Sequence, residues 1–255
     1  MHFKKKLNAV SLCFALLLIL IFPDFCFSQE QRLADNNTIG WFIYTGTFKI
    51  NPKLAIHTEY QWRRVNTVKN WQQGLFRAGI NYAVHKDVSV NAGYAFAETF
   101  PYGDYPNANP FPEHRFFEQV VLKQAINKIE LSHRFTLEQR FVGKPAFENN
   151  KKTIYWNYLS RIRYRLRSEI PIDKKHKNKW RIILQDELFI GWGKNIGTNI
   201  FDQNRIGILL GYKLNKNIKS EAGYLNQVLQ QGKKVNNKAV FQYNNGFMFA
   251  THLAF

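Results

Sequence analysis

The chain has 255 residues and is strongly basic, with 36 lysines and arginines against 18 aspartates and glutamates. Aromatic residues make up 16% and apolar residues 45%, a balance that suits a barrel with one apolar and one polar face better than a helical bundle. Both cysteines, Cys13 and Cys26, lie near the amino terminus, so residues 29–255 offer no disulfide framework and no thiolate metal site.

The first residues have the layout of a secretory signal. Three lysines at 4–6 are followed by an apolar run over 12–22, which is shorter than the ~20 residues of a membrane-spanning helix. A small residue then precedes Gln29. An uncleaved anchor and a lipoprotein cut before Cys26 are the alternatives, but the run is short and the residues before Cys26 are bulky or charged. We therefore expect residues 1–28 to be a cleaved signal peptide.

The rest of the chain, 29–255, predicts one domain of β-strands joined by short and long links in alternation. That alternation is typical of outer-membrane barrels, whose periplasmic turns are short and whose extracellular loops are longer. The long links are 67–70, 99–112, 143–153, 192–202 and 231–237. The expected strands are 38–50, 54–66, 71–84, 88–98, 113–125, 129–142, 154–170, 180–191, 203–214, 218–230 and 238–255.

The strand count poses a problem, because eleven strands are recognisable while bacterial single-chain barrels have even numbers. Either a twelfth strand lies within 29–37, or one recognisable segment does not belong to the wall. A hairpin turn at 244–246 would split the last segment into pieces shorter than the ~9–11 residues of a spanning strand. We predict an antiparallel up-and-down transmembrane β-barrel of about twelve strands, with ten as the alternative.

Polar and apolar residues alternate cleanly in several strands. In 154–168 the residues Ile162, Tyr164 and Leu166 share one face, and Arg161, Arg163, Arg165 and Arg167 share the other. An arginine facing hydrocarbon near the bilayer midplane costs ~2–4 kcal/mol, so these arginines must face water or carboxylates. We therefore place much of the positive charge inside the barrel and expect no nucleic-acid partner.

The carboxyl terminus carries an assembly signal. Phe247, Phe249, Leu253 and Phe255 share one face of the last strand, and the chain ends on an aromatic residue. Such an ending looks like the sorting signal of an outer-membrane barrel. We predict that Phe255 directs the chain to the barrel assembly machinery of a Gram-negative bacterium. We expect the folded barrel to be a monomer surrounded by lipid and lipopolysaccharide.

Charged side chains on neighbouring strands predict a network in the lumen. Opposite residues on antiparallel neighbours lie ~4.5–5.5 Å apart at Cβ, which suits ladders of arginine and glutamate. These ladders could plug a narrow lumen and set the register, or the arginine excess could form a small anion-preferring pore. The predicted network is Glu130, Arg134, Glu138, Arg140, Arg161, Arg163, Arg165, Arg167, Glu187, Arg205 and Glu221.

Two other functions are weaker alternatives. A lipid-modifying hydrolase would need a nucleophile and a base, but Ser132 and His133 are adjacent and point to opposite faces. His57 and Glu59 share a face, where a polar lumen pair is the simpler interpretation. The segment 99–112, rich in proline and aromatic residues, could bind a ligand or fold over the barrel mouth, although a merely stiff surface loop ordered by proline is the favoured interpretation. We predict no catalytic, cofactor-binding or metal-binding residues.

The carboxyl-terminal part of the chain carries distinctive motifs at 202–205, at Gly211-Tyr212 and at 221–227, where Glu221 is followed by Gly223-Tyr224-Leu225-Asn226-Gln227. These segments resemble the domain of unknown function 2490 family. Similar motifs occur at 113–115, 133–141 and 186–189, and Trp41 also fits. The resemblance covers nearly all of 29–255 and implies an outer-membrane barrel. It implies no activity, because the family's function is not established.

Overall fold

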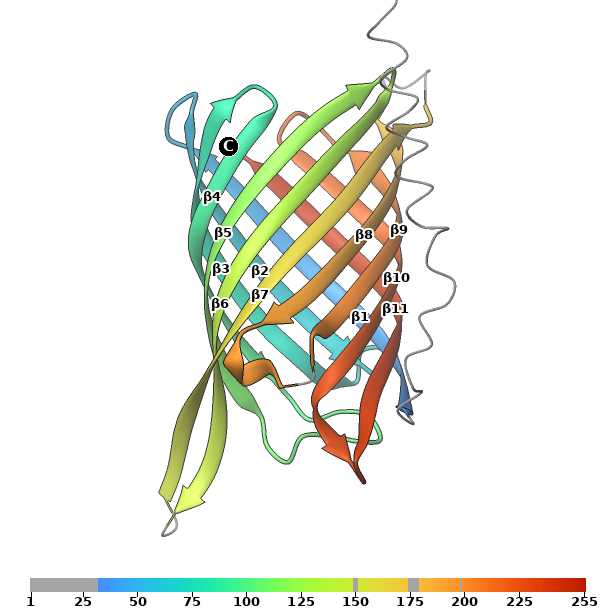
Figure 1. Cartoon of the computed structure of the whole chain (residues 1–255). Coiled ribbons are helices and arrows are strands. Elements are labelled where there is room, and N and C mark those ends of the chain that lie inside the picture. Colours follow the sequence, from blue (N-terminus) through green and yellow to red (C-terminus); the bar gives the residue numbers. More distant parts are fainter. Residues whose placement is uncertain (1–31, 149–150, 174–178, 198) are drawn as a thin grey trace, which may run out of the picture. The chain divides into compact units, whose positions relative to one another are not determined.

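Eleven long strands form the described part of the protein (Figure 1). The computed structural model describes residues 32–148, 151–173, 179–197 and 199–255, so the predicted signal peptide lies outside the described residues. Within these ranges no helix is long and apolar enough to cross a membrane. The strands are β1 (Arg32–Lys49), β2 (Leu54–Val65), β3 (Asn70–His85), β4 (Val88–Thr99), β5 (Phe111–Ile126), β6 (Ile129–Glu148), β7 (Lys151–Pro171), β8 (Trp180–Trp192), β9 (Phe201–Lys213), β10 (Ile218–Val235) and β11 (Lys238–Ala254), with a 3-10 turn, η1 (Lys194–Ile196).

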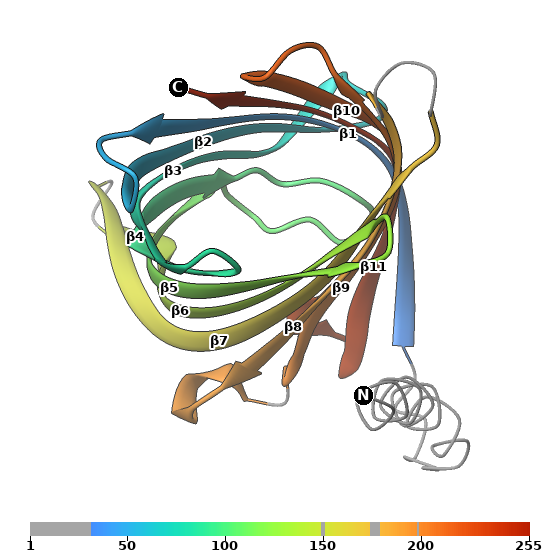
Figure 2. The same cartoon turned by 90° about the horizontal axis from the view of Figure 1, so that it is seen from above.

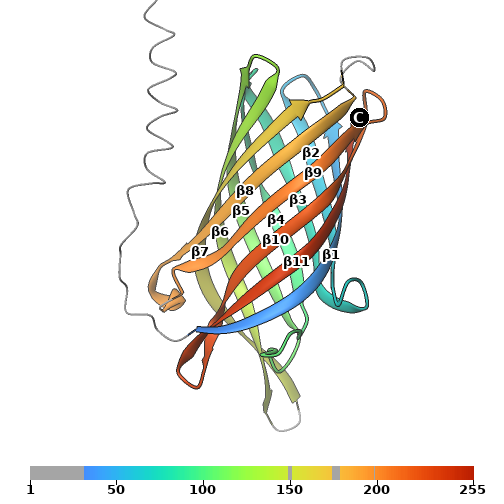
Figure 3. The ribbon, with the colours of Figure 1, turned by 90° about the vertical axis from the view of Figure 1, so that its right-hand side faces the viewer.

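The strands form a closed barrel in which each is antiparallel to the next along the chain (Figure 2). The barrel closes between β1 and β11, which lie side by side in Figure 3. With an odd number of strands these two must run parallel. Backbone bonds agree, since Phe255 N–H donates to Thr47 O at 2.9 Å and Lys49 N–H donates to Phe255 O at 2.8 Å. A parallel ladder brackets one residue between two in this way.

The prediction of twelve strands was therefore wrong, and so was the alternative of ten. Residues 32–37 belong to β1 and form no strand of their own, and 244–246 continue through β11 without a turn. The even-number rule assumes that the first and last strands pair antiparallel. Here a parallel seam satisfies the same backbone donors and acceptors, which allows eleven strands to close.

The wall has an apolar outer face and a polar inner face. On β7 the side chains of Ile162, Tyr164 and Leu166 are exposed, whereas Arg161 and Arg163 are buried. The neighbouring strands repeat this pattern, with Phe135 and Leu137 of β6 outside and Thr136 and Glu138 inside. Alternation along a strand places successive side chains on opposite faces of the sheet. The predicted orientation of the arginine strand is therefore found in the barrel.

The two ends of the barrel differ. We call the end with the β1–β2, β3–β4, β5–β6 and β9–β10 links the turn end, and the other the loop end.

Two predicted long links are strand instead: β10 and β11 meet through Asn236 and Asn237, both with positive φ as a two-residue type I′ turn requires. Residues 143–148 and 151–153 likewise extend the β6–β7 hairpin beyond its neighbours (Figure 1).

Candidate functional site

The middle of the lumen is occupied by Glu138 and two arginines. Glu138 is 1% exposed, and its carboxylate accepts hydrogen bonds from Arg161 Nε at 2.8 Å and from Arg163 Nη1 at 2.6 Å. Glu138 and Arg161 are direct cross-strand partners of β6 and β7. The register of this strand pair therefore places a buried carboxylate between two guanidinium groups.

A second carboxylate extends the network to β8. Glu187 accepts hydrogen bonds from Arg163 Nη2 at 2.7 Å and from Arg134 Nη2 at 2.8 Å. Arg163 thus connects Glu138 to Glu187 across β7. Charge-assisted bonds of this length are the stronger class of hydrogen bond, so these residues fix the relative positions of three strands.

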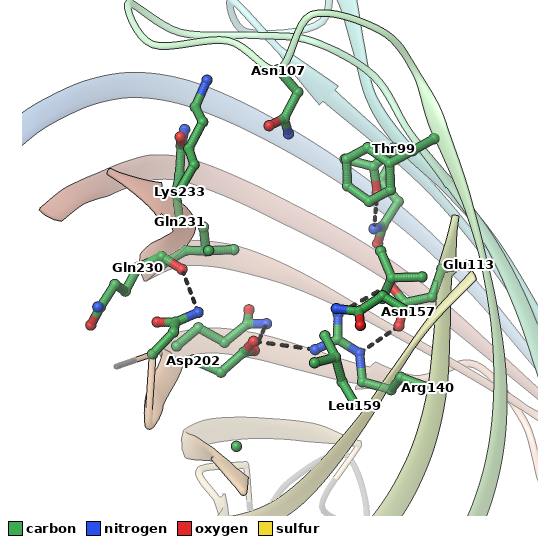
Figure 4. A pocket seen from close by; sticks show the side chains of 18 of the residues that line it. Thr99, Asn107, Glu113, Arg140, Asn157, Leu159, Asp202, Gln230, Gln231 and Lys233 are labelled. Atoms are coloured by element: carbon green, nitrogen blue, oxygen red, sulfur yellow. Dashed lines mark hydrogen bonds and ion pairs between the residues drawn. The ribbon is translucent and has the colours of Figure 1, made fainter. Parts of the chain in front are cut away.

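Toward the loop end, two further acids pair with arginines from several strands (Figure 4). Glu113 accepts from Arg115 Nε at 2.6 Å and also binds Arg140. Asp202 of β9 pairs with Arg140 at 3.3 Å and with Arg161 at 2.7 Å. Arg140 therefore bridges Glu113 on β5 to Asp202 on β9, two strands that are not neighbours in the wall.

Toward the turn end, Glu221 of β10 is the main acid. Its side chain is 1% exposed and lies 2.5 Å from Arg167, 3.1 Å from Lys219 and 3.3 Å from His252. Arg167 belongs to β7, so this contact also crosses the lumen rather than following a strand ladder.

Aromatic rings fill the space between the charged groups. Trp41 and Phe189 are buried, and the guanidinium carbon of Arg205 lies 4.9 Å from one ring and 4.5 Å from the other. The guanidinium carbon of Arg63 also lies over the Trp41 ring, 4.0 Å from its centroid. Neither Arg205 nor Arg63 lies within ion-pair distance of a described carboxylate; both are held by glutamines and by cation–π contacts. We call Trp41, Phe189, Glu138, Arg161, Arg163 and Arg205 the central layer.

Two cavities lie on either side of the central layer. The loop-side cavity has a volume of about 570 Å³ and is lined by Arg63, Glu113, Arg140 and Asp202, among others (Figure 4). The turn-side cavity has a volume of about 550 Å³ and reaches down to the β1–β2 turn. Arg205 lines both, which marks the central layer as the boundary between them.

The segment after β4 folds into the barrel mouth. The Tyr102 hydroxyl donates to Gln242 at 2.8 Å and accepts from Gln72 at 3.2 Å and Asn244 at 3.3 Å. Burial raises the pKa of the Tyr102 phenol above its usual range. Asp35 holds the next residues, accepting from the Asp104 backbone N–H at 3.2 Å. The segment 99–112 is therefore folded over the mouth and is not the merely stiff surface loop that the sequence favoured.

Of the eleven residues in the predicted charge network, eight form ion pairs inside the barrel and three differ. Glu130 lies exposed at the turn end, 2.7 Å from Arg181, and takes no part in the central layer. Arg205 faces aromatic rings instead of an acid, and Arg165 makes no ion pair or hydrogen bond with a described residue. The remaining residues, Arg134, Glu138, Arg140, Arg161, Arg163, Arg167, Glu187 and Glu221, are brought together inside the barrel.

Several lumen residues were missed. Arg77 on β3 pairs at 3.5 Å with Glu59 on β2, the acid already expected to share a lumen pair with His57, and Glu113 and Asp202 are the acids of the loop-side cavity. Strand alternation carried a usable signal for Glu113, because it shares one face of its strand with Arg115. The structure does not pair Ser132 with His133 as the hydrolase alternative would require. His133 Nδ1 forms a hydrogen bond with Tyr164 Oη at 2.9 Å on the outer face, away from Ser132.

Comparisons with known proteins complete the description. The family model described as "Protein of unknown function (DUF2490)" matches residues 38–238, from within β1 to the first residue of β11, and confirms the predicted resemblance. No curated protein matches the chain. A solved structure titled "NanC porin structure in rhombohedral crystal form" is similar at 11% sequence identity and a TM-score of 0.42, with 78% of this chain and 90% of that chain covered.

Proposed function

This chain belongs to the DUF2490 family of proteins of unknown function, and we propose that it is an outer-membrane β-barrel that admits small anions through a narrow lumen. In this proposal the chain is exported by its signal peptide and folded by the barrel assembly machinery. It then acts as a monomer surrounded by lipid and lipopolysaccharide.

The outer face supports a membrane location. Residues such as Ile80, Phe116, Ile162 and Ile208 are about half exposed on the wall, and the lumen holds the charged groups. In hydrocarbon every backbone polar group needs a protein partner, and a closed barrel without free edges meets that need. The parallel seam between β1 and β11 completes this closure.

The charge of the two cavities supports an anion preference and is the observation on which the proposal rests. Among the described residues that line the turn-side cavity, nine are lysine or arginine and three are glutamate. Seven lysines and arginines line the loop-side cavity, against Glu113 and Asp202. An excess of one sign of charge within low-dielectric walls attracts the opposite ion, and rings of arginine or lysine select anions in pores.

The central layer supports a small conductance. Its ion pairs and stacked rings occupy the lumen between the two cavities, so an ion must pass between side chains that are already bonded to one another. Arg205 is the best placed to move, because it lines both cavities and has no carboxylate partner. The proposal is therefore a narrow passage and not a wide water-filled pore.

Planar bilayers test this proposal directly. Under a potassium chloride gradient, the purified protein should show a small conductance. The sign of its reversal potential should show that chloride is more permeant than potassium. Arg205→Gln should reduce the anion preference, because it removes a lumen charge without leaving an acid unpaired. Lys216→Gln, at the exposed β9–β10 turn, is the matched control and should change nothing. Cation selectivity would contradict the proposal, and a lack of conductance would favour a purely structural barrel.

A further inference from the structure

We propose that Arg134 and Arg165 form a binding site for a small soluble oxyanion, a phosphate or a carboxylate, on the wall of the turn-side cavity. The inference deepens the proposed function and rests on it in one respect, because anions must reach the lumen. It adds a specific site to a general preference for negative charge.

The two arginines are direct partners across the β6–β7 pair. Opposite residues on antiparallel strands have Cβ atoms ~4.5–5.5 Å apart, and like charges placed in this way repel each other. Both side chains line the turn-side cavity. An anion between their guanidinium groups would turn this repulsion into two attractions.

Both arginines also have a buried Nε–H without an acceptor. Arg134 donates only one hydrogen bond to a described residue, from Nη2 to Glu187, and its Nε–H is buried without a partner. Arg165 donates none to any described residue, and its Nε–H is also buried without a partner. Buried charged donors without acceptors are costly. A ligand oxygen is the partner that the chemistry of these donors requires.

The nearby carboxylates are already engaged. Glu187 is opposite Arg165 in the β7–β8 register, but its Oε1 accepts from Arg163 and Arg134. Glu221 pairs with Arg167 at 2.5 Å. The described ion pairs of Glu187 and Glu221 therefore go to other basic residues, and none of them reaches Arg165.

The ligand class follows from the donors. Guanidinium groups present parallel N–H bonds in a fork that matches the oxygens of a carboxylate or a phosphate. Chloride has no such geometry and would respond only to the charge. Water could also fill the cavity and accept these hydrogen bonds, so the experiment must separate a saturable site from a hydrated one.

Thermal unfolding of the purified barrel in detergent tests the site. Inorganic phosphate is titrated while chloride keeps the ionic strength constant, so that general screening does not change. We expect the wild-type melting temperature to rise with phosphate and to saturate, as binding to the folded state requires. Arms with acetate and with glycerol phosphate distinguish a carboxylate, a free phosphate and a phosphate of the headgroup type.

Variants locate the site. Arg165→Gln should raise the phosphate concentration that gives half of the maximal rise in melting temperature at least about tenfold. Arg165→Lys should raise it less, because the charge remains while the forked guanidinium is lost. Lys123→Gln is the matched control, since it removes one positive charge from the same cavity. It should change the phosphate concentration at half-maximal stabilisation by less than about threefold. If Arg165→Gln does not fold, the lysine variant carries the comparison with Lys123→Gln.

The outcomes separate the site from the channel. Three outcomes would each overturn the site. The Arg165 variants could respond to phosphate as the wild type does, Arg165→Gln and Lys123→Gln could lose the response equally, or the melting temperature of the wild type could rise without saturating. An anion-selective reversal potential with no saturable phosphate response would leave the proposed function intact. Saturable binding in a protein that proves cation-selective would refute the channel and retain the site.

Discussion

Phe48 and Phe255 stack across the seam of the barrel, with ring centroids 5.2 Å apart and ring planes 10° from parallel. Farther along the seam, Thr45 Oγ1 forms a hydrogen bond with His252 Nδ1 at 2.5 Å, and Asp35 Oδ2 accepts a hydrogen bond from Gln242 Nε2 at 3.0 Å. Each of these three pairs is separated by 207 positions in the sequence. A constant separation is the mark of parallel strands, because an antiparallel pair would keep a constant sum. The last residue of the chain therefore lies at the end of a parallel seam.

Phe255→Asp should reduce assembly in the outer membrane and leave aggregates in the periplasm, since both the terminal aromatic residue and its stacking partner are lost. Heat-modifiable migration on a gel measures the folded fraction. Phe48→Ala is the control: it removes the stack but keeps the terminal residue. If the two variants assemble equally poorly, Phe255 acts through the seam and not as a signal. Normal migration of Phe255→Asp would contradict the prediction.

Gly246→Ala should open the seam. A Cβ at this position would overlap the carbonyl oxygen of Ile39 on β1, so the two backbones could not keep their approach. Overpacking of this kind typically costs ~1–3 kcal/mol, which should appear as a lower unfolding temperature. Gly232→Ala provides the comparison, because a Cβ there meets nothing within 4 Å. Equal unfolding temperatures in the two variants would argue against a tight parallel seam.

Glu138→Ala should destabilise the barrel much more than Thr136→Ala. Both positions face the lumen on β6, but Glu138 holds Arg161 and Arg163. Removing one partner of a buried ion pair typically costs ~3–5 kcal/mol, because a charge remains buried without compensation. Urea unfolding in detergent measures the difference. Mild effects in both variants would indicate a hydrated, open lumen in place of the central layer.

Alkaline pH should release the segment that Tyr102 anchors. The pKa of this phenol is higher in the fold than its usual value of about 10, so the protonated form is favoured in the anchored state. Its contribution is therefore complete below about pH 10 and is lost as the pH rises through the higher folded value. Protease cleavage within residues 100–110 should increase over this range. Tyr102→Phe cannot ionise and should show no such step; the same step in that variant would rule out Tyr102 as its cause.

Strand periodicity was enough to predict the class of fold and the orientation of its faces. The alternation of Arg161, Arg163, Arg165 and Arg167 with apolar residues determined which side of β7 faces inward, because successive side chains of a strand point in opposite directions. That argument needs only one strand at a time. It also placed Glu138 and Glu187 in the lumen, and the family match confirmed the resemblance carried by the same segments.

Only the tertiary structure decided how the strands close and which charges meet. Whether the number of strands is odd or even depends on whether β1 and β11 pair parallel or antiparallel. These two segments are 207 positions apart, and neither sequence shows by itself which pairing forms. Partners such as Arg167 with Glu221, and Arg140 with Asp202, join strands that are not neighbours in the wall. These contacts depend on the diameter and stagger of the closed barrel, properties of all eleven strands together.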